Sequence, residues 1–225
     1  MIIWKESECM TRVNIVKYSK TIKDRVILED VSLSFTGGKV YGLKGVNGSG
    51  KTMLLRAVCG LIYPTHGYVE IDGERLDKDI SFPRSISALI ESPAFLDNFT
   101  GYKNLEMIAS LKEVATKEDI ENALREVGLD PHDTRTYRKY SLGMKQKLGL
   151  ACCFMENPDI ILLDEPFNAL DEESVEKVKK IIFKHKERGA LIILACHDGE
   201  SLSSLSDEII PAVEGRVQDP VLSKR

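Results

Sequence analysis

Residues 45–52 read Gly-Val-Asn-Gly-Ser-Gly-Lys-Thr and match the pattern G-x-x-x-x-G-K-[ST] at every fixed position. The short apolar run at residues 40–43 precedes this octapeptide, and residues 53–58 are expected to form a helix directly after it. A strand, a glycine-rich turn and a helix in this order let successive backbone N–H groups converge on an anion, because glycines leave these groups uncovered. The segment therefore predicts a phosphate-binding loop.

Each part of this loop has an expected chemical role. The positive end of the following helix faces the phosphates. Lys51 is expected to reach the β- and γ-phosphates of ATP, while the Thr52 hydroxyl ligates Mg²⁺. A chance glycine-rich turn is the alternative, with odds on the order of one in a hundred at average glycine usage. The other residues expected to bind ATP here are Gly45, Asn47, Gly48, Ser49, Gly50 and Met53.

Two adjacent acids follow a second apolar run, Ile-Ile-Leu-Leu at residues 160–163. Ligands of α/β folds bind at the carboxyl edge of the sheet, where Asp164 and Glu165 would lie. We expect Asp164 to hold Mg²⁺ through its water shell and Glu165 to act as the general base that polarises the attacking water. The alternative is a solvated strand end followed by a helix N-cap, for which Pro166 and Asn168 are suitable.

Apolar runs and amphipathic helical patterns alternate along the chain. Residues 160–163 and 191–195 are continuous apolar runs, as in strands that are buried on both faces, and a helical pattern between them ends at Gly189. Residues 26–35 alternate instead, which is typical of an antiparallel strand. The fold predicted is an α/β P-loop NTPase (RecA-like) core with a mostly parallel sheet covered by helices and an N-terminal antiparallel β part.

The middle of the chain is expected to be a helical insertion. Thr100 is a candidate helix start, and Thr116 with Asp119 forms a capping box before a second helical pattern. We therefore expect one domain over residues 1–225, with a core at about 1–92 and 158–225 and a helical subdomain at about 93–157.

Composition narrows the class of protein. The 225 residues are 43% apolar and 29% charged, which suits one globular α/β domain. Every apolar run is far shorter than the roughly 20 residues of a spanning helix, and no secretory signal is recognisable. The formal charge of −4 argues against nucleic-acid binding. Five cysteines without a CxxC pair indicate small buried side chains in a reducing compartment.

Further motifs surround the two acids in a fixed order. Residues 140–147 read Tyr-Ser-Leu-Gly-Met-Lys-Gln-Lys, residues 161–166 read Ile-Leu-Leu-Asp-Glu-Pro, and residues 168–171 read Asn-Ala-Leu-Asp. His197 follows the last apolar run. In this order, from about residue 10 to 215, the chain resembles the ATP-binding-cassette (ABC) ATPases, with their signature, second nucleotide motif, D-loop and switch histidine.

The resemblance implies roles for individual residues. His197 would contact the γ-phosphate and act with Glu165 in catalysis, and Tyr18 would stack on adenine. The signature positions, which are not expected to face the chain's own phosphate loop, would bind the ATP of a second subunit. Without the resemblance, each residue has a purely structural alternative: Ser141 as an ordinary N-cap, His197 as a structural histidine, and Tyr18 as a packed or exposed side chain. The implied signature residues are Ser141, Leu142, Gly143 and Met144, and those of the D-loop are Asn168 and Asp171.

Two departures from the family pattern stand out. Glu91 lies where the family usually has glutamine; it is expected to contact ATP and ligate Mg²⁺ as glutamine does, and it adds a negative charge beside the phosphates. Leu142 and Met144 replace the usual glycine and glutamine. The segments ALIESPAF and YSLGMKQKLGLA resemble the subgroup that serves bacitracin- and lantibiotic-type peptide export and immunity.

The sequence thus predicts an ATP-hydrolysing subunit of an ABC transporter that uses ATP and Mg²⁺ at the cytoplasmic face of the membrane. Its expected partners are a second nucleotide-binding domain, either the same chain or a paralogue, and integral membrane permease subunits. Phe95, Leu96 and Phe99 are either exposed for those subunits or part of the core. The alternatives are a soluble ABC ATPase that acts on nucleic acid or the ribosome and a small-molecule kinase.

Overall fold

The computed structural model describes residues 10–197 and 199–223. Its centre is a mostly parallel sheet in which the strands lie in the order β10-β9-β3-β8-β7-β6, with β11 paired to β9. The middle strands are buried on both faces, as their continuous apolar sequences predict. The strands are β3 (Val40–Lys44), β6 (Ile86–Leu89), β7 (Ile160–Asp164), β8 (Leu191–Cys196), β9 (Glu208–Val213), β10 (Arg216–Val217) and β11 (Val221–Leu222).

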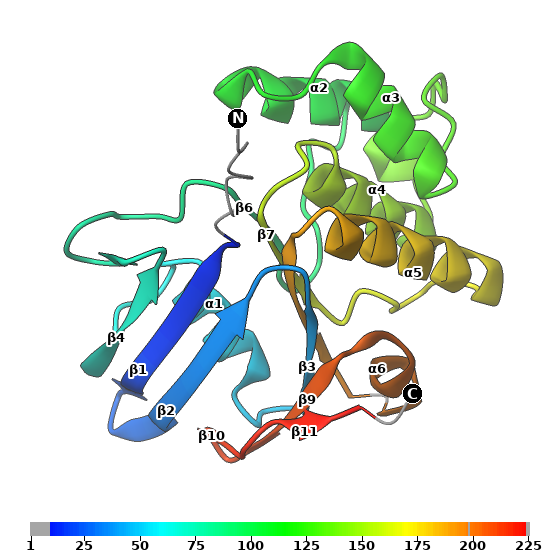
Figure 1. Ribbon diagram of the computed structural model, residues 1–225. Coiled ribbons are helices and arrows are strands. Elements are labelled where there is room, and N and C mark those ends of the chain that lie inside the picture. Colours follow the sequence, from blue (N-terminus) through cyan, green and yellow to red (C-terminus); the bar gives the residue numbers. More distant parts are fainter. Residues whose placement is uncertain (1–9, 198, 224–225) are drawn as a thin grey trace, which may run out of the picture.

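A second, antiparallel sheet lies beside the first, in the order β2-β1-β4-β5 (Figure 1). Its long first two strands form a hairpin that turns at Lys23 and Asp24, both with positive φ. Helix α1 (Lys51–Val58) packs its apolar side chains against both sheets. The strands are β1 (Arg12–Ile22), β2 (Arg25–Thr36), β4 (His66–Ile71) and β5 (Glu74–Arg75).

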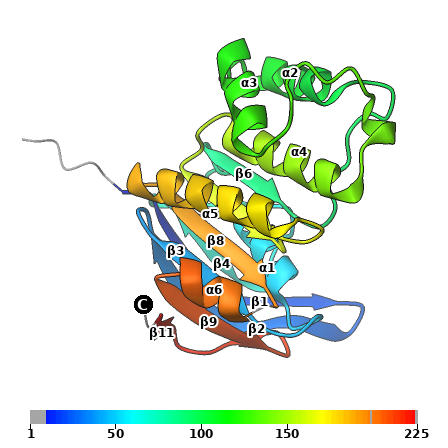
Figure 2. The ribbon, with the colours of Figure 1, turned by 90° about the vertical axis from the view of Figure 1, so that its right-hand side faces the viewer.

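The helical segment between β6 and β7 stacks above the sheet, whereas α5 and α6 cover one of its faces (Figure 2). Side-chain oxygens cap three of its helices, because Thr100, Thr116 and Ser141 each accept a hydrogen bond from a backbone N–H of the first turn. The helices are α2 (Gly101–Lys112), α3 (Lys117–Glu126), the 3-10 helix η1 (Tyr137–Lys139), α4 (Leu142–Phe154), α5 (Glu172–Glu187) and α6 (Gly199–Leu205).

Strand β7 separates two hydrophobic cores. Ile161 and Leu163 face the core that the helices α2 to α6 share with the sheet. Ile160 and Leu162 face the core between the two sheets and α1. This alternation follows from the two-residue period of a strand, and it fixes the end of β7 from both sides.

The α/β fold, the parallel sheet and the helices of the middle segment agree with the sequence-based expectations. An N-cap at Pro166 or Asn168 is wrong, because α5 begins only after Asp171. Of the described cysteines, Cys59, Cys153 and Cys196 are buried and Cys152 is half-buried; Cys9 lies outside the described residues. Within residues 10–197 and 199–223, no helix is both long and apolar enough to cross a membrane.

Candidate functional site

A cavity of about 680 Å³ lies at the carboxyl ends of the central strands, where the phosphate loop, the end of β7 and the first turn of α4 meet. Most residues expected to bind ATP or metal line it. Ser92 and Gln146, which the sequence did not indicate, line it too. The residues singled out from the sequence, for any role, that line the cavity are Asn47, Gly48, Gly50, Lys51, Thr52, Met53, Glu91, Leu142, Asp164, Glu165 and Asn168.

The phosphate loop connects β3 directly to α1, and two of its glycines are needed for its shape. Gly50 has φ 105°, a left-handed conformation that side chains oppose, and it forms the N-cap of α1. A Cβ atom on Gly45 would lie 2.4 Å from the carbonyl oxygen of Ala212 and 2.5 Å from Ser49 Oγ. Gly45 therefore leaves no room for a side chain, and neither it nor the buried Ser49 lines the cavity.

Lys51 is buried and its ammonium group curls back over the loop. Its Nζ atom donates hydrogen bonds to the carbonyl oxygens of Gly45 at 2.7 Å and Val46 at 3.2 Å. The same residue lines the cavity. The positive charge therefore lies at the loop, where an arriving phosphate oxygen can replace these neutral acceptors with a stronger charge-assisted bond.

Thr52 and Asp164 connect the two nucleotide motifs. The Thr52 hydroxyl donates to Asp164 Oδ2 at 2.6 Å. Burial raises the pKa of Asp164, the nearby charges of Glu165 and Glu91 add to that rise, and the hydrogen bond from Thr52 opposes it. A hydroxyl and the carboxylates of Asp164 and Glu91 around one cavity are hard oxygen ligands, so the donor set fits Mg²⁺.

Glu165 is held by the end of strand β8. Its backbone N–H donates to the carbonyl oxygen of Ala195 at 2.8 Å. Its carboxylate contacts His197 twice, accepting from the His197 backbone N–H at 3.0 Å and lying 2.9 Å from Nδ1 of the ring. His197 is exposed and does not line the cavity, but it contacts Glu165, which does. Glu165 has φ 48°, a left-handed conformation that is uncommon for residues other than glycine.

Gln146 anchors the loop that carries Glu165. This buried amide, one turn into α4, donates from Nε2 to the carbonyl oxygens of Glu165 at 3.3 Å and Pro166 at 3.1 Å. The signal in the sequence is weak, since one glutamine in a helix has no distinctive spacing. Gln146 therefore ties the helical segment to the loop that follows β7.

Of the four signature residues, one lines the cavity and the others do not. Ser141 caps α4, accepting from the Met144 N–H at 3.2 Å. A Cβ atom on Gly143 would lie 2.7 Å from the carbonyl oxygen of Ala169, so glycine is needed there. The expectation that the signature as a whole turns away from the chain's own phosphate loop is wrong for Leu142, which is exposed and lines the same cavity. The first turn of α4 lies at the edge of that cavity.

The two D-loop residues also differ in their surroundings. Asn168 lines the cavity. Asp171 does not, and its carboxylate caps α5 by accepting from the Ser174 N–H at 2.8 Å. Hydrogen bonding to the Ser174 side chain, and then to its backbone N–H, holds the pKa of Asp171 below its usual value.

The expectation that Tyr18 stacks on adenine is wrong. Tyr18 is only 1% exposed, and its hydroxyl donates to the carbonyl oxygen of Ile62 at 3.0 Å. Burial raises the pKa of its phenol to about 12, with a smaller contribution from Asp77. The ring is packed between the sheets and offers no free face, because irregular pairing of β1 on both sides of Tyr18 places it inward.

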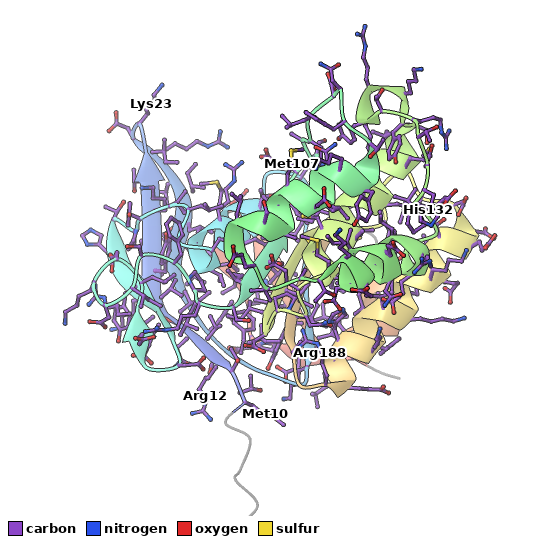
Figure 3. The ribbon with its side chains drawn as sticks, turned by 90° about the horizontal axis from the view of Figure 1, so that it is seen from above. Met10, Arg12, Lys23, Met107, His132 and Arg188 are labelled. Carbon is purple, nitrogen blue, oxygen red and sulfur yellow. The ribbon has the colours of Figure 1, made fainter. Side chains whose placement is uncertain are left out.

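The free end of the β1–β2 hairpin reaches the cavity instead. Lys23 marks this end in the view from above, well separated from Met107 on α2 (Figure 3). Ile22 and Arg25 flank the turn as a pair and line the cavity together with Ile27. If the adenine base of ATP meets the hairpin, it would contact the aliphatic side chains of Ile22 and Ile27 and the guanidinium group of Arg25.

Residues 28–168 match a family model described as ABC transporter. The chain is 43% identical over 206 residues to the uncharacterized ABC transporter ATP-binding protein YybJ of Bacillus subtilis, which covers 92% of this chain and 94% of that protein. It is 33% identical over 205 residues to the bacitracin transport ATP-binding protein BcrA of Enterococcus faecalis, with 90% of this chain and 67% of that protein covered. The lantibiotic transport ATP-binding protein SrtF of Streptococcus pyogenes is 32% identical over 206 residues (91% and 88%).

Solved structures show the same fold. A structure described as the ATP binding subunit of an ABC transporter has a TM-score of 0.84 at 26% identity and covers 93% of this chain and 89% of its own. A dimeric ATP-binding cassette bound to ADP and Pi has a TM-score of 0.86 at 24% identity, with 95% and 99% covered.

Proposed function

The chain belongs to the ABC transporter family, and we propose that it is the ATP-hydrolysing subunit of an exporter whose membrane-spanning parts are separate chains. The observation that carries this proposal is the convergence of the phosphate loop, Asp164 and Glu165 on one cavity. The proposed substrate is a peptide antibiotic or a similar amphiphile, as the names of the relatives BcrA and SrtF suggest.

The triphosphate binds at the loop between β3 and α1. Backbone N–H groups of the loop and the first turn of α1 surround its phosphates, and Lys51 exchanges its two carbonyl acceptors for phosphate oxygens. Thr52, Glu91 and Asp164 would hold Mg²⁺, which, when bound, neutralises phosphate charge and favours attack at the γ-phosphorus. Ile22 and Arg25, at the end of the hairpin, contact the adenine base of ATP.

Glu165 acts as the general base. It takes a proton from a water molecule while the water oxygen forms a bond to the γ-phosphorus. The bond from this phosphorus to the oxygen that bridges to the β-phosphate breaks, which leaves ADP and inorganic phosphate. His197 fixes the carboxylate through both of its contacts with it.

Assembly completes the site. The chain is one nucleotide-binding domain, with a helical subdomain at about residues 93–157 inserted into the core, and it pairs with a second cassette. Ser141, Gly143 and Met144 would then contribute to the partner's ATP site, where the N-terminus of α4 favours anions.

The surface for the membrane subunits is proposed at residues 91–99, on the cytoplasmic face of the membrane. Leu96 is 55% exposed and Phe99 41% exposed. Phe95 packs edge-on against Tyr137, with 5.4 Å between the ring centres, so it supports the segment from below. Two exposed apolar side chains on a supported loop suit contact with another protein.

Recovery of the tagged chain from membranes of its source organism tests the proposal. We expect it to retain an integral membrane protein of several spans and to hydrolyse ATP. Leu96→Glu should reduce that recovery, whereas Leu111→Glu, on the exposed end of α2, is the matched control. Recovery with ribosomes or nucleic acid and without a membrane protein would contradict the transport function.

A further inference from the structure

Arg56 and Glu91 form an ion pair at the rim of the nucleotide cavity. Arg56 lies in the last turn of α1, and its Nη2 atom is 2.7 Å from Glu91 Oε1. Glu91 follows β6 and has φ 62°, so its backbone adopts a left-handed conformation. The pair therefore joins the helix that begins at the phosphate loop to the segment that leads into α2.

The cavity already contains much negative charge. Glu91 lines it together with Asp164 and Glu165, and the phosphates of ATP bring more. Of the cations in the lining, Lys51 is engaged with the loop carbonyls. Arg25, the other cation in the lining, lies at the hairpin end. Arg56 does not line the cavity itself, but it contacts Glu91 directly.

The ion pair contributes little to folding. The side chain of Arg56 is 34% exposed and that of Glu91 63% exposed. Pairs in such positions typically stabilise a protein by about 0–1 kcal/mol, because water screens both charges. Stabilisation of the fold therefore does not explain why Arg56 contacts Glu91.

We propose that Arg56 is a positioning residue for Glu91. It compensates the charge of the carboxylate and holds it at the rim, so that a triphosphate can bind beside a glutamate. Its bond uses Oε1 and leaves Oε2 for a metal ligand role. This inference rests on the proposed function, because it assigns Arg56 to the same nucleotide site.

The affinity for ATP without metal tests the proposal. Isothermal titration of the full chain with ATP in EDTA is compared for Arg56→Met in the wild-type and Glu91→Gln backgrounds. We expect Arg56→Met to weaken binding about threefold in the wild type, the size of effect of an exposed charge, and to change it little when residue 91 is glutamine. Arg56→Lys should retain most of the affinity.

Arg84→Met is the matched control. It removes another exposed arginine–glutamate pair, 2.6 Å from Arg84 Nη2 to Glu74 Oε1, away from the cavity. It should leave ATP affinity unchanged, and thermal unfolding verifies that all variants fold.

Three results would overturn the proposal. An unchanged affinity for ATP in Arg56→Met would mean that Arg56 has no role at the nucleotide site. Equal weakening in both backgrounds would mean that Arg56 acts on the nucleotide without Glu91. A wild-type chain that binds no ATP would overturn the proposed function and this inference with it.

Discussion

The hydroxyl of Thr52 donates a hydrogen bond of 2.6 Å to Asp164, although 112 positions separate the two residues in the sequence. The bond ties the first turn of α1 to the end of β7, so it joins the helix that follows the phosphate loop to the carboxylate proposed to hold metal. Such a link lowers the cost of ordering the site when ATP binds.

The general base gives the first prediction. Glu165→Gln should keep ATP binding but lower the rate of phosphate release by roughly 10²–10⁴-fold, the usual contribution of a general base. Because ATP is then not consumed, size-exclusion chromatography with ATP should show a stable dimer. Glu172→Gln, an exposed acid in the first turn of α5, is the control. Near-native hydrolysis in Glu165→Gln would exclude Glu165 as the base.

The second prediction concerns the loop cation. Lys51→Ala should weaken ATP binding by about tenfold or more, because a charge-assisted bond to phosphate contributes about 1.5–3 kcal/mol. Binding is measured by titration with a fluorescent ATP analogue. Lys180→Ala, an exposed lysine on α5, should bind as the wild type does. Unchanged affinity in Lys51→Ala would contradict the assignment of the phosphate loop.

The charge of Glu91 gives the third prediction. Glu91→Gln should raise the steady-state ATPase rate by roughly two- to fivefold, since it removes an exposed negative charge worth up to about 1 kcal/mol beside the phosphates. The rate is measured at saturating ATP and metal. A flat or lower rate would mean that the carboxylate does not restrain turnover.

The hairpin end gives the fourth prediction. Ile22→Tyr should lower the KM for ATP by roughly fivefold or more, because stacking of a base on an aromatic ring contributes about 1–3 kcal/mol. Tyr18→Phe is the contrasting variant: it removes the hydrogen bond to Ile62 and should cost about 1 kcal/mol of stability without changing KM. An unchanged KM in Ile22→Tyr would mean that the hairpin end does not meet the adenine base.

His185 gives the fifth prediction, on stability and pH. Its ring is stacked on Phe154, and burial, followed by the charges of Arg188 and Lys184, lowers its pKa to about 4 from 6.5. Between these values the unfolded chain binds the proton and the folded chain does not, so stability is lost as pH falls from 6.5 towards 4. The full loss is on the order of 3 kcal/mol.

Urea unfolding at pH 7.5 and pH 5 measures this effect. His185→Leu should unfold with a smaller pH difference than the wild type, whereas His132→Gln, an exposed residue, should keep the full difference. An unchanged pH difference in His185→Leu would show that His185 does not titrate in this range.

Local patterns determined what the sequence could reveal. The phosphate loop, the acids at the end of β7 and the caps at Thr116 and Ser141 depend on short segments, and they lie where the motifs predict. Tyr18 was misassigned because the pairing irregularities that turn it inward depend on β4 as well as β2, and no local pattern marks them.

Contacts between segments that are distant in the sequence could not be predicted either. Gln146 and Arg56 gain their significance from partners 19 and 35 positions away. Leu142 lines the cavity only because α4 is positioned by the packing of the whole helical segment against the sheet. Such placements follow from tertiary packing, which the spacing of residues along the chain does not encode.

Strand β7 has side chains in both hydrophobic cores, and its last residue is Asp164. A protein interior is packed too densely to absorb a change of shape without passing it on. A substitution deep on either side can therefore shift the acid at the strand end while the chain still folds. Natural variants that lose transport at elevated temperature should consequently map to buried aliphatic positions remote from ATP, and to both sides of the sheet.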